Sequence, residues 1–514
     1  MADLLERLTA AASNGMTASI WALEKPDAIA IHDPVGTKTF FDLNANANRV
    51  VRLLRAHGVV AGDAVALMCS NRSEFVEVLS ACLRGGYRFT PVNWHLTTDE
   101  VEYIINDCEA KALIAETRYP AATDSKTPNV VVKISIGLEA DGFLPYASSI
   151  AGLDGSDIDD PTLGGQMLYT SGTTGRPKGV YRRNPAGVLV PGPGADDDVQ
   201  MCAGPAYHAA PLAFDVRSAM AQGNPLIFLD RWDSENVLRT IEKYKVTRAH
   251  LVPIMFQRLL ALPTEVKAKY DISTLRYIIH GAAPCPPEVK KAMIDWVGPI
   301  INEYYAGSEG GAGFVVSSEE WLTKPGTVGK MPLPDAMKIL DDEGNEVERG
   351  TSGTLYFKVS PIAPFEYFKD PVKTAAAHKD GYFTLGDVGY LDEDDYLFLT
   401  GRTAECIISG GVNIYPQEID NEIIKHDAVE DSCAIGVPNE EWGEEVKVVV
   451  TLNPGHQPSE DLGKDILAFA RANLAGYKGP RSIEFVDELP RSPAGKIQRG
   501  KVRKPSWAGR SREI

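Results

Sequence analysis

The stretch Tyr169-Thr-Ser-Gly-Thr-Thr-Gly-Arg-Pro-Lys-Gly179 brings glycines, hydroxyl side chains and a lysine close together, directly after the apolar pair Met167-Leu168. Glycine lets a backbone wrap an anion, and hydroxyl and N–H groups donate hydrogen bonds to it. Lys178 adds a point charge that suits phosphate. The stretch therefore favours a phosphate-binding loop, although a flexible surface loop has a similar composition. The expected ligands are Thr170, Ser171, Gly172, Thr173, Thr174 and Lys178.

The two best-known nucleotide loops are absent from the sequence. The spacing G-x-x-x-x-G-K-[ST] does not occur, and neither Gly192-Pro-Gly194 nor Gly311-Ala-Gly313 continues into G-x-G-x-x-G. A P-loop and a Rossmann dinucleotide site are therefore unsupported, and the fold class has to come from the surrounding elements.

Short apolar runs alternate with amphipathic stretches along most of the chain. Thr97-x-x-Glu100 is a capping box that opens one of the expected helices. This alternation predicts parallel sheets covered by helices. Expected strands cover residues 64–68, 113–115, 225–229, 250–252, 275–280 and 300–304, and expected helices cover residues 74–83, 234–244, 254–262 and 287–296.

The pattern changes after about residue 325, where short strands are separated by Gly and Asp turns. Strands are expected at residues 354–358, 382–384 and 396–400. From about residue 403, strands at 431–437, 445–452 and 482–486 and a helix at 459–474 predict a small α+β domain. We therefore expect one domain at residues 1–402 and a second at residues 403–514.

Composition excludes several classes of protein. The chain has 514 residues and a formal net charge of −18, which disfavours nucleic acid as a partner. No apolar run is long enough to span a membrane, and the N-terminus lacks the apolar region of a signal peptide. The seven cysteines form no C-x-x-C pair, which indicates reduced thiols and a cytoplasmic location.

The glycine-rich stretch closely resembles the phosphate loop of the acyl-adenylate-forming superfamily, which comprises acyl- and aryl-CoA synthetases, nonribosomal adenylation domains and luciferases. Other motifs follow in that family's order, so the resemblance covers about residues 28–500. It implies a large α/β N-terminal domain of parallel-rich sheets with a small β-barrel-like part, and a small mobile α+β C-terminal domain. It also implies that a carboxylic acid attacks ATP to give acyl-AMP and pyrophosphate.

The resemblance also assigns nucleotide and metal ligands. It implies that Glu309, with Thr170 nearby, holds Mg²⁺, that Ser308 donates to the α-phosphate and that Tyr305 stacks on adenine. Lys496, in Pro493-Ala-Gly-Lys496, is expected to neutralise charge during adenylation. The remaining expected contacts are Gly281, Ala282, Ala283, Glu303 and Tyr304 on the adenine side, Asp387 on the ribose hydroxyls, and Arg402 as a second nucleotide contact.

The acyl pocket is expected beside His208, in Ala206-Tyr-His208, which the resemblance places among the catalytic residues. The expected walls include many small residues, and we see no fixed basic residue for a second substrate carboxylate. A large apolar acid, either fatty or polycyclic, is therefore favoured, although the same alanines and glycines could simply pack helices against strands. The expected walls are Phe214, Val252, Met255, Phe256, Ala306 and Gly307.

In the family the C-terminal domain rotates after adenylation and admits the thiol of CoA. Gly410, Gly411 and Lys478 are the residues expected on the CoA side. The usual charged hinge residue is replaced here by Ala404, which is followed by Glu405. Thioester formation is therefore expected to be slow or to need a partner, such as an acyltransferase.

Three other interpretations remain open at this stage. Ala306-Gly-Ser308-Glu-Gly310 resembles a degenerate nucleophile elbow of a serine hydrolase. The protein could also adenylate an acid for another enzyme, or be a non-catalytic binding homologue. A homodimer is compatible with the sequence, which identifies neither the acid nor the pathway.

Overall fold

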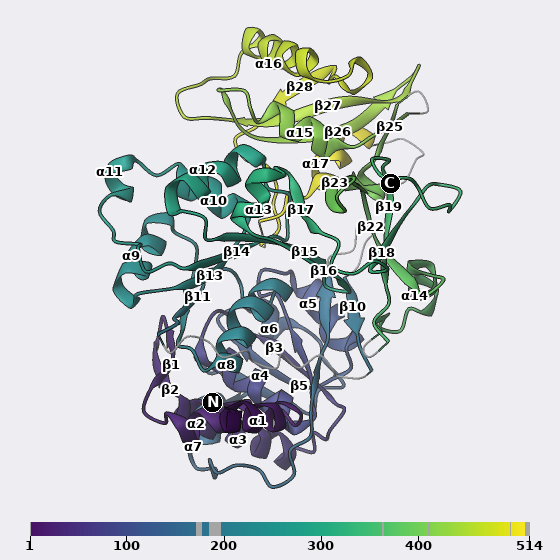
Figure 1. The fold of residues 1–514 in the computed structure, drawn as a ribbon. Coiled ribbons are helices and arrows are strands. Elements are labelled where there is room, and N and C mark those ends of the chain that lie inside the picture. The colour runs from purple at the N-terminus through teal and green to yellow at the C-terminus, as the bar shows by residue number, and fades with distance from the viewer. Residues whose placement is uncertain are drawn as a thin grey trace. The chain divides into compact units, whose positions relative to one another are not determined.

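The computed structural model describes residues 2–170, 177–183, 197–361, 364–409, 412–493 and 495–508. It divides into two compact units, each described by itself below, whose elements are labelled in Figure 1. The first unit is Met1–Leu251, Ala261–Ile279 and Ser360–Ala375, and the second is Val252–Leu260, His280–Val359 and Ala376–Ile514. The expected division of domains at residues 402 and 403 stays a prediction.

One sheet of the first unit is parallel between all its neighbouring strands, as far as the described residues go. Every residue of β3 (Ala64–Met68) is buried, as expected for a strand covered on both faces. This confirms the predicted parallel α/β arrangement. In sheet order the strands are β7 (Leu144–Pro145), β6 (Val132–Ile136), β5 (Ala110–Glu116), β3, β4 (Arg88–Pro91) and β8 (Gly165–Gln166).

A second sheet in this unit has the parallel pairs β1–β12, β11–β12 and β11–β13, and β2 pairs antiparallel with β1. Its strands in order are β14 (Tyr277–His280), β13 (Arg248–Leu251), β11 (Gln200–Cys202), β12 (Leu226–Phe228), β1 (Ile29–Asp33) and β2 (Gly36–Thr39). A small antiparallel sheet contains β20 (Glu366–Tyr367), β10 (Lys178–Tyr181) and β9 (Leu168–Thr170).

The helices of the first unit begin and end at clear local signals. The predicted capping box is present: the Thr97 hydroxyl accepts from the Glu100 backbone N–H, and the Glu100 carboxylate accepts from Thr97 N–H. Gly86, with φ +76°, ends α4 in the left-handed conformation. The helices are α1 (Ala2–Ala12), α2 (Thr17–Glu24), α3 (Phe40–Ala56), α4 (Ser73–Gly85), α5 (Thr98–Asp107), α6 (Pro120–Asp124), α7 (Tyr146–Ala151), the π-helix η1 (Pro211–Arg217), α8 (Ser218–Gln222), α9 (Ser234–Tyr244), α11 (Thr264–Lys267) and α14 (Pro371–Ala377).

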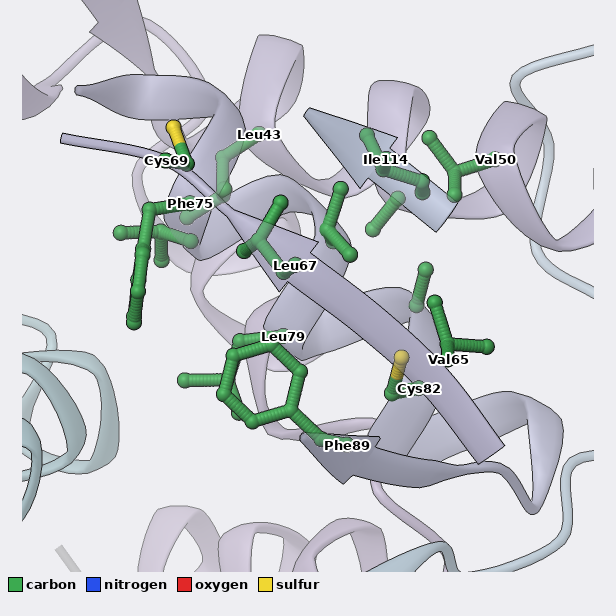
Figure 2. Close-up of a cluster of buried hydrophobic side chains, with 14 of the residues drawn as sticks. Leu43, Val50, Val65, Leu67, Cys69, Phe75, Leu79, Cys82, Phe89 and Ile114 are labelled. Atoms are coloured by element: carbon green, nitrogen blue, oxygen red, sulfur yellow. The ribbon is translucent and has the colours of Figure 1, made fainter. Parts of the chain in front are cut away.

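The core of the first unit lies between its parallel sheet and the helices that cover it. Figure 2 shows part of it, where Val65 and Leu67 of β3 pack among side chains of α3 and α4. Phe75 and Phe89 meet edge to face, with ring centroids 5.6 Å apart. Cys69 and Cys82 belong to this cluster, and all seven cysteines of the chain are free thiols.

The second unit is mainly antiparallel. It contains the hairpin β15 (Ile301–Gly307) and β16 (Gly310–Val316). One sheet has the order β17 (Thr327–Lys330), β23 (Tyr396–Arg402), β22 (Tyr382–Leu391), β19 (Gly353–Lys358) and β18 (Met337–Leu340), and β21 (His378–Lys379) also pairs with β22. The last sheet has the order β25 (Val412–Ile414), β24 (Ile407–Ser409), β27 (Gly443–Leu452) and β26 (Val429–Asn439), and β28 (Ser482–Phe485) pairs parallel with β27.

Helices of the second unit include the three predicted ones. The prediction of 254–262 corresponds to α10, that of 287–296 to α12 and that of 459–474 to α16. No helix in the described parts of the chain is both long and apolar enough to span a membrane. The helices are α10 (Pro253–Leu260), α12 (Pro287–Val297), α13 (Ser318–Thr323), η2 (Thr403–Glu405), α15 (Pro416–Ile423), α16 (Glu460–Asn473), η3 (Gly476–Lys478), α17 (Arg499–Arg503) and η4 (Lys504–Trp507).

Candidate active site

Asp387 is the centre of a charged cluster in the second unit. Its Oδ2 accepts a hydrogen bond from Tyr305 Oη at 2.6 Å, and its Oδ1 lies 2.7 Å from Arg402 Nε. The register of β22 and β23 places Asp387 directly opposite Arg402. Tyr305 and Arg402 therefore both contact the Asp387 carboxylate, and all three residues were predicted separately as nucleotide contacts.

Burial shapes the electrostatics of this cluster. The Asp387 side chain is 8% exposed, whereas that of Arg402 is 34% exposed. Burial, and then the Asp387 carboxylate, hold the pKa of Tyr305 well above its usual value, so its hydroxyl stays a hydrogen-bond donor. Burial works to lower the pKa of Arg402, but Asp387 and Glu405 outweigh it and raise that pKa.

Lys496 belongs to the same electrostatic environment. Burial and then the charge of Arg402 lower its pKa, while Glu405 and Asp387 oppose that shift. Its backbone closes a tight turn, in which Ser492 N–H donates to Lys496 O at 2.8 Å. Because burial and Arg402 disfavour the charged lysine, an added negative charge nearby would stabilise its ammonium form.

The segment that carries Lys496 is anchored by two arginines. Arg491 pairs with Asp431 and donates from Nη1 to Gly495 O at 2.6 Å. Arg499, 8% exposed, lies 2.8 Å from Asp420, and its Nε lies 3.1 Å from Glu405 Oε2. These pairs fix the backbone on both sides of Lys496.

Glycine is required next to Lys496 and at the end of β14. Gly495 has φ +80°, and a Cβ there would lie 2.6 Å from Ile254 Cγ2. A Cβ at Gly281 would lie 2.6 Å from the Tyr304 carbonyl oxygen. Ala282 follows with φ +66°, an uncommon conformation for a residue with a Cβ, and such strain often marks functional sites.

Glu303 and Tyr304 make contacts inside the protein. Glu303 Oε2 accepts from Lys290 Nζ at 2.7 Å and lies 3.5 Å from His280 Nε2. Burial raises the pKa of Glu303, and burial lowers that of Lys290, which is fully buried against the Trp321 ring. Tyr304 is 8% exposed. The expected nucleotide roles of Glu303, Tyr304 and Ala283 stay predictions.

The β15–β16 hairpin positions Ser308 and Glu309. A Cβ at Gly307 would lie 2.9 Å from Leu385 and 3.2 Å from Glu309 Oε2, so glycine lets the turn approach both. Ala306 is exposed, whereas Ser308 and Glu309 are half-buried. Of the expected acyl walls in this unit, Val252, Met255 and Phe256 are all buried.

The phosphate-loop prediction falls partly outside the described residues. Thr170 ends β9 and Lys178 begins β10, and the two face each other across the antiparallel pair. Lys178 Nζ lies 5.0 Å from the centroid of the Tyr367 ring. The two strands on either side of residues 171–176 therefore pair with each other. Ser171, Gly172, Thr173 and Thr174 lie outside the described residues.

His208 and Phe214 lie in the first unit near the π-helix η1. Burial lowers the pKa of His208 to about 4, so its imidazole is neutral at pH 7. Within the described part of the chain, His208 Nε2 is buried without a hydrogen-bond partner, as is Tyr207 Oη beside it. The Phe214 ring stacks on His250 with centroids 5.7 Å apart. Unpaired polar atoms beside an aromatic wall suit a ligand that has both apolar and polar parts.

The residues expected on the CoA side are only partly described. Gly410 and Gly411 lie outside the described residues. Lys478 Nζ lies 2.7 Å from the Glu418 carboxylate, so its charge is already paired. Ala404 is the middle residue of the short helix η2.

Two charged residues were not singled out from the sequence. Glu405 contacts Arg499, and no local pattern predicts a pair so far apart in the chain. Arg217 ends η1 and is half-buried. The signal that could have identified it is an arginine within the otherwise mostly apolar stretch 211–221.

Comparison with known proteins identifies the family. The model of the AMP-binding enzyme family matches residues 19–364, and that of the AMP-binding enzyme C-terminal domain matches residues 418–496. The chain belongs to the AMP-binding enzyme family. The chain is an enzyme of the AMP-forming acid–CoA ligase type, and this membership leaves the serine hydrolase interpretation unsupported.

Individual members of the AMP-binding enzyme family resemble the chain over nearly its full length. A feruloyl-CoA synthase from an Amycolatopsis species is 32% identical, covering 93% of this chain and 96% of that protein. The fatty acid–[acyl-carrier-protein] ligase ScoC of Streptomyces coeruleorubidus is 30% identical, covering 97% of both chains. The structure of the anthranilate CoA ligase AuaEII in complex with anthranoyl-AMP has a TM-score of 0.85 at 25% identity, covering 96% of this chain and 97% of that one.

Proposed function

We propose that this protein activates a large hydrophobic carboxylic acid as acyl-AMP, using ATP, and then transfers the acyl group to the thiol of CoA. The observation that most supports this proposal is that Tyr305 and Arg402 both contact the Asp387 carboxylate. The charges of Asp387 and Arg402 also act on Lys496. The resemblance assigns a nucleotide-binding or catalytic role to each of these four residues, which favours a catalytic protein over a non-catalytic homologue.

The roles of these residues follow from their chemistry. A carboxylate accepts two hydrogen bonds from a diol, so Asp387 would bind the ribose hydroxyls while Arg402 holds it in place. Tyr305 would present its ring to adenine, with its hydroxyl fixed on Asp387. Lys496 would stabilise the negative charge that grows as one anion attacks another. His208, neutral at pH 7, would hydrogen-bond near the reacting carboxylate.

Mg²⁺ fits this site with few protein ligands. No group of three or more His, Cys, Asp or Glu suited to a metal occurs in the described ranges. Mg²⁺ bound with phosphates needs only one or two protein ligands, so half-buried Glu309, together with Thr170, is sufficient. The ion would neutralise phosphate charge.

Acid-dependent pyrophosphate exchange tests the proposal. Purified protein, ATP, Mg²⁺ and labelled pyrophosphate would be incubated with a panel of long-chain fatty, polycyclic and small aromatic acids. We expect exchange with at least one large hydrophobic acid and little with the small aromatic acids. A protein that binds ATP but exchanges with no acid would support the non-catalytic alternative.

The acyl acceptor needs a separate measurement. The two curated relatives described above differ in acceptor, since one name specifies CoA and the other an acyl-carrier protein. Because Ala404 replaces a charged hinge residue, we expect slow single-protein turnover to acyl-CoA, with acyl-AMP accumulating. Single-turnover assays with CoA or a holo acyl-carrier protein would show this, and fast acyl-CoA formation would contradict it.

A further inference from the structure

Arg217 is a half-buried cation that the described chain leaves without a counter-charge. It ends the π-helix η1, three residues after Phe214. Its Nη1 donates to the amide oxygen of Gln166 at 3.3 Å, and no carboxylate of the described residues lies within ion-pair distance. Gln166 ends β8, four residues before Thr170.

Two other arginines of the first unit, half-buried Arg72 and fully buried Arg84, have a carboxylate that opposes their charge. Arg72 pairs with Glu74 at 2.6 Å and with Glu116 at 3.2 Å. Arg84 is bonded to uncharged asparagines, but Asp157 supplies an opposing charge nearby. Arg217 differs from these two, because no carboxylate of the described residues pairs with it.

The carboxylate nearest to Arg217 in sequence is used elsewhere. Asp215 Oδ1 accepts from Gln200 Nε2 at 2.8 Å and from His250 N–H at 3.1 Å. Residues two apart on a helix do not share a face, so Asp215 turns into the core and leaves Arg217 uncompensated. The π-helical stretch also fits this interpretation, because such segments are rare and are frequently found at functional sites.

An uncompensated guanidinium is costly to bury. Burial lowers the pKa of Arg217, and no opposing charge offsets that shift. A bound anion would restore the balance, and the planar fork of arginine matches a carboxylate with two parallel hydrogen bonds. Arg217 is in the same short π-helix as the expected acyl wall Phe214, and it has unused capacity for an anion.

We propose that Arg217 binds a second carboxylate at the far end of the acid substrate, so that the preferred substrates are long dicarboxylic acids with an apolar middle. This inference rests on the proposed acyl-activating function and narrows its substrate class. It also revises the expectation that the pocket holds no basic residue for a second carboxylate. A phosphate of ATP carries similar chemistry, so the test separates the acid from the nucleotide.

The test compares straight-chain acids that differ only at the far end. Pyrophosphate exchange would be measured with each monoacid from octanoic to hexadecanoic acid and with the dicarboxylic acid of the same length. We expect kcat/KM for the best dicarboxylic acid to exceed that of its monoacid by at least about tenfold, as for a charge-assisted contact. Arg217→Met should abolish this preference, and Arg217→Lys should retain part of it.

Arg49→Met is the matched control. Arg49 is a half-buried arginine of the same unit, with hydrogen bonds to the uncharged oxygens Leu153 O and Asn46 Oδ1. We expect Arg49→Met to leave the ratio of kcat/KM for the dicarboxylic acid to kcat/KM for the monoacid unchanged, even if the protein becomes less stable.

Two results would overturn this inference while leaving the proposed function intact. One is exchange with monoacids in which no dicarboxylic acid is preferred. The other is an Arg217→Met variant that loses activity equally on both acids, since Arg217 would then serve the fold. A rise in the KM for ATP with both acids would count in the same way, since Arg217 would then bind the nucleotide. Absence of exchange with every acid would instead refute the proposed function.

Discussion

Lys496→Ala is expected to lower acid-dependent pyrophosphate exchange by about 100- to 1000-fold, the usual effect of losing one fixed donor to a developing negative charge. Lys496 lies in the electrostatic field of Arg402, Glu405 and Asp387, so its ammonium is placed to compensate added negative charge. Its turn is fixed by Arg491 and Arg499 rather than by its own side chain. The variant should therefore fold normally.

Lys501→Ala is the matched control for Lys496→Ala. Lys501 is an exposed lysine on α17, five residues further along the chain, and we place it in no site. Both variants should unfold at the same temperature as the wild type, and only Lys496→Ala should lose exchange. Full exchange activity in Lys496→Ala would contradict the assignment.

The pH profile gives a second readout for Lys496. The charged form is the active one, and its pKa is lowered, so exchange should fall as the pH rises through a value below that of an ordinary lysine. Lys496→Arg keeps its charge at any accessible pH. If the Lys496→Arg variant supports exchange, the fall of its exchange rate at alkaline pH should therefore occur at a higher pH than in the wild type. An unchanged alkaline limb would show that another group titrates.

Local signals predicted individual elements well. The helix expected at 234–244 matches α9 to the residue, and the capping box at Thr97 opens α5. Both depend on contacts within a few residues of sequence. The π-helical pitch of η1 has no such local signature, so the direction of Arg217 could not be predicted from periodicity.

The candidate site was predicted residue by residue but not as an arrangement. Motifs identified Asp387, Arg402 and Tyr305 separately, whereas their meeting depends on the β22–β23 register and on β15. Glu303 was expected at the nucleotide, but strand alternation does not say which face carries a buried partner such as Lys290. Long-range ion pairs are set by tertiary packing.

Asp387→Asn is expected to raise the KM for ATP about 10- to 100-fold and to lower exchange further, because it removes charge-assisted hydrogen bonds. The carboxylate accepts from Tyr305 Oη and holds Arg402 Nε at 2.7 Å. An asparagine can accept on one oxygen only, and its NH₂ group would face another donor. The guanidinium of Arg402 would lose its counter-charge and the ribose hydroxyls would lose an acceptor.

Tyr305→Phe and Asp392→Asn separate these effects. Tyr305→Phe removes one hydrogen bond but leaves the Asp387–Arg402 pair, so the KM for ATP should rise by only about 3- to 10-fold. Asp392 lies 2.7 Å from Lys324 and takes no part in the Asp387 cluster. Replacing Asp392 should therefore lower stability without changing the KM for ATP. If Asp387→Asn lowered stability while the KM stayed at the wild-type value, the carboxylate would serve only to hold Arg402. The ribose contact would then have to come from another residue.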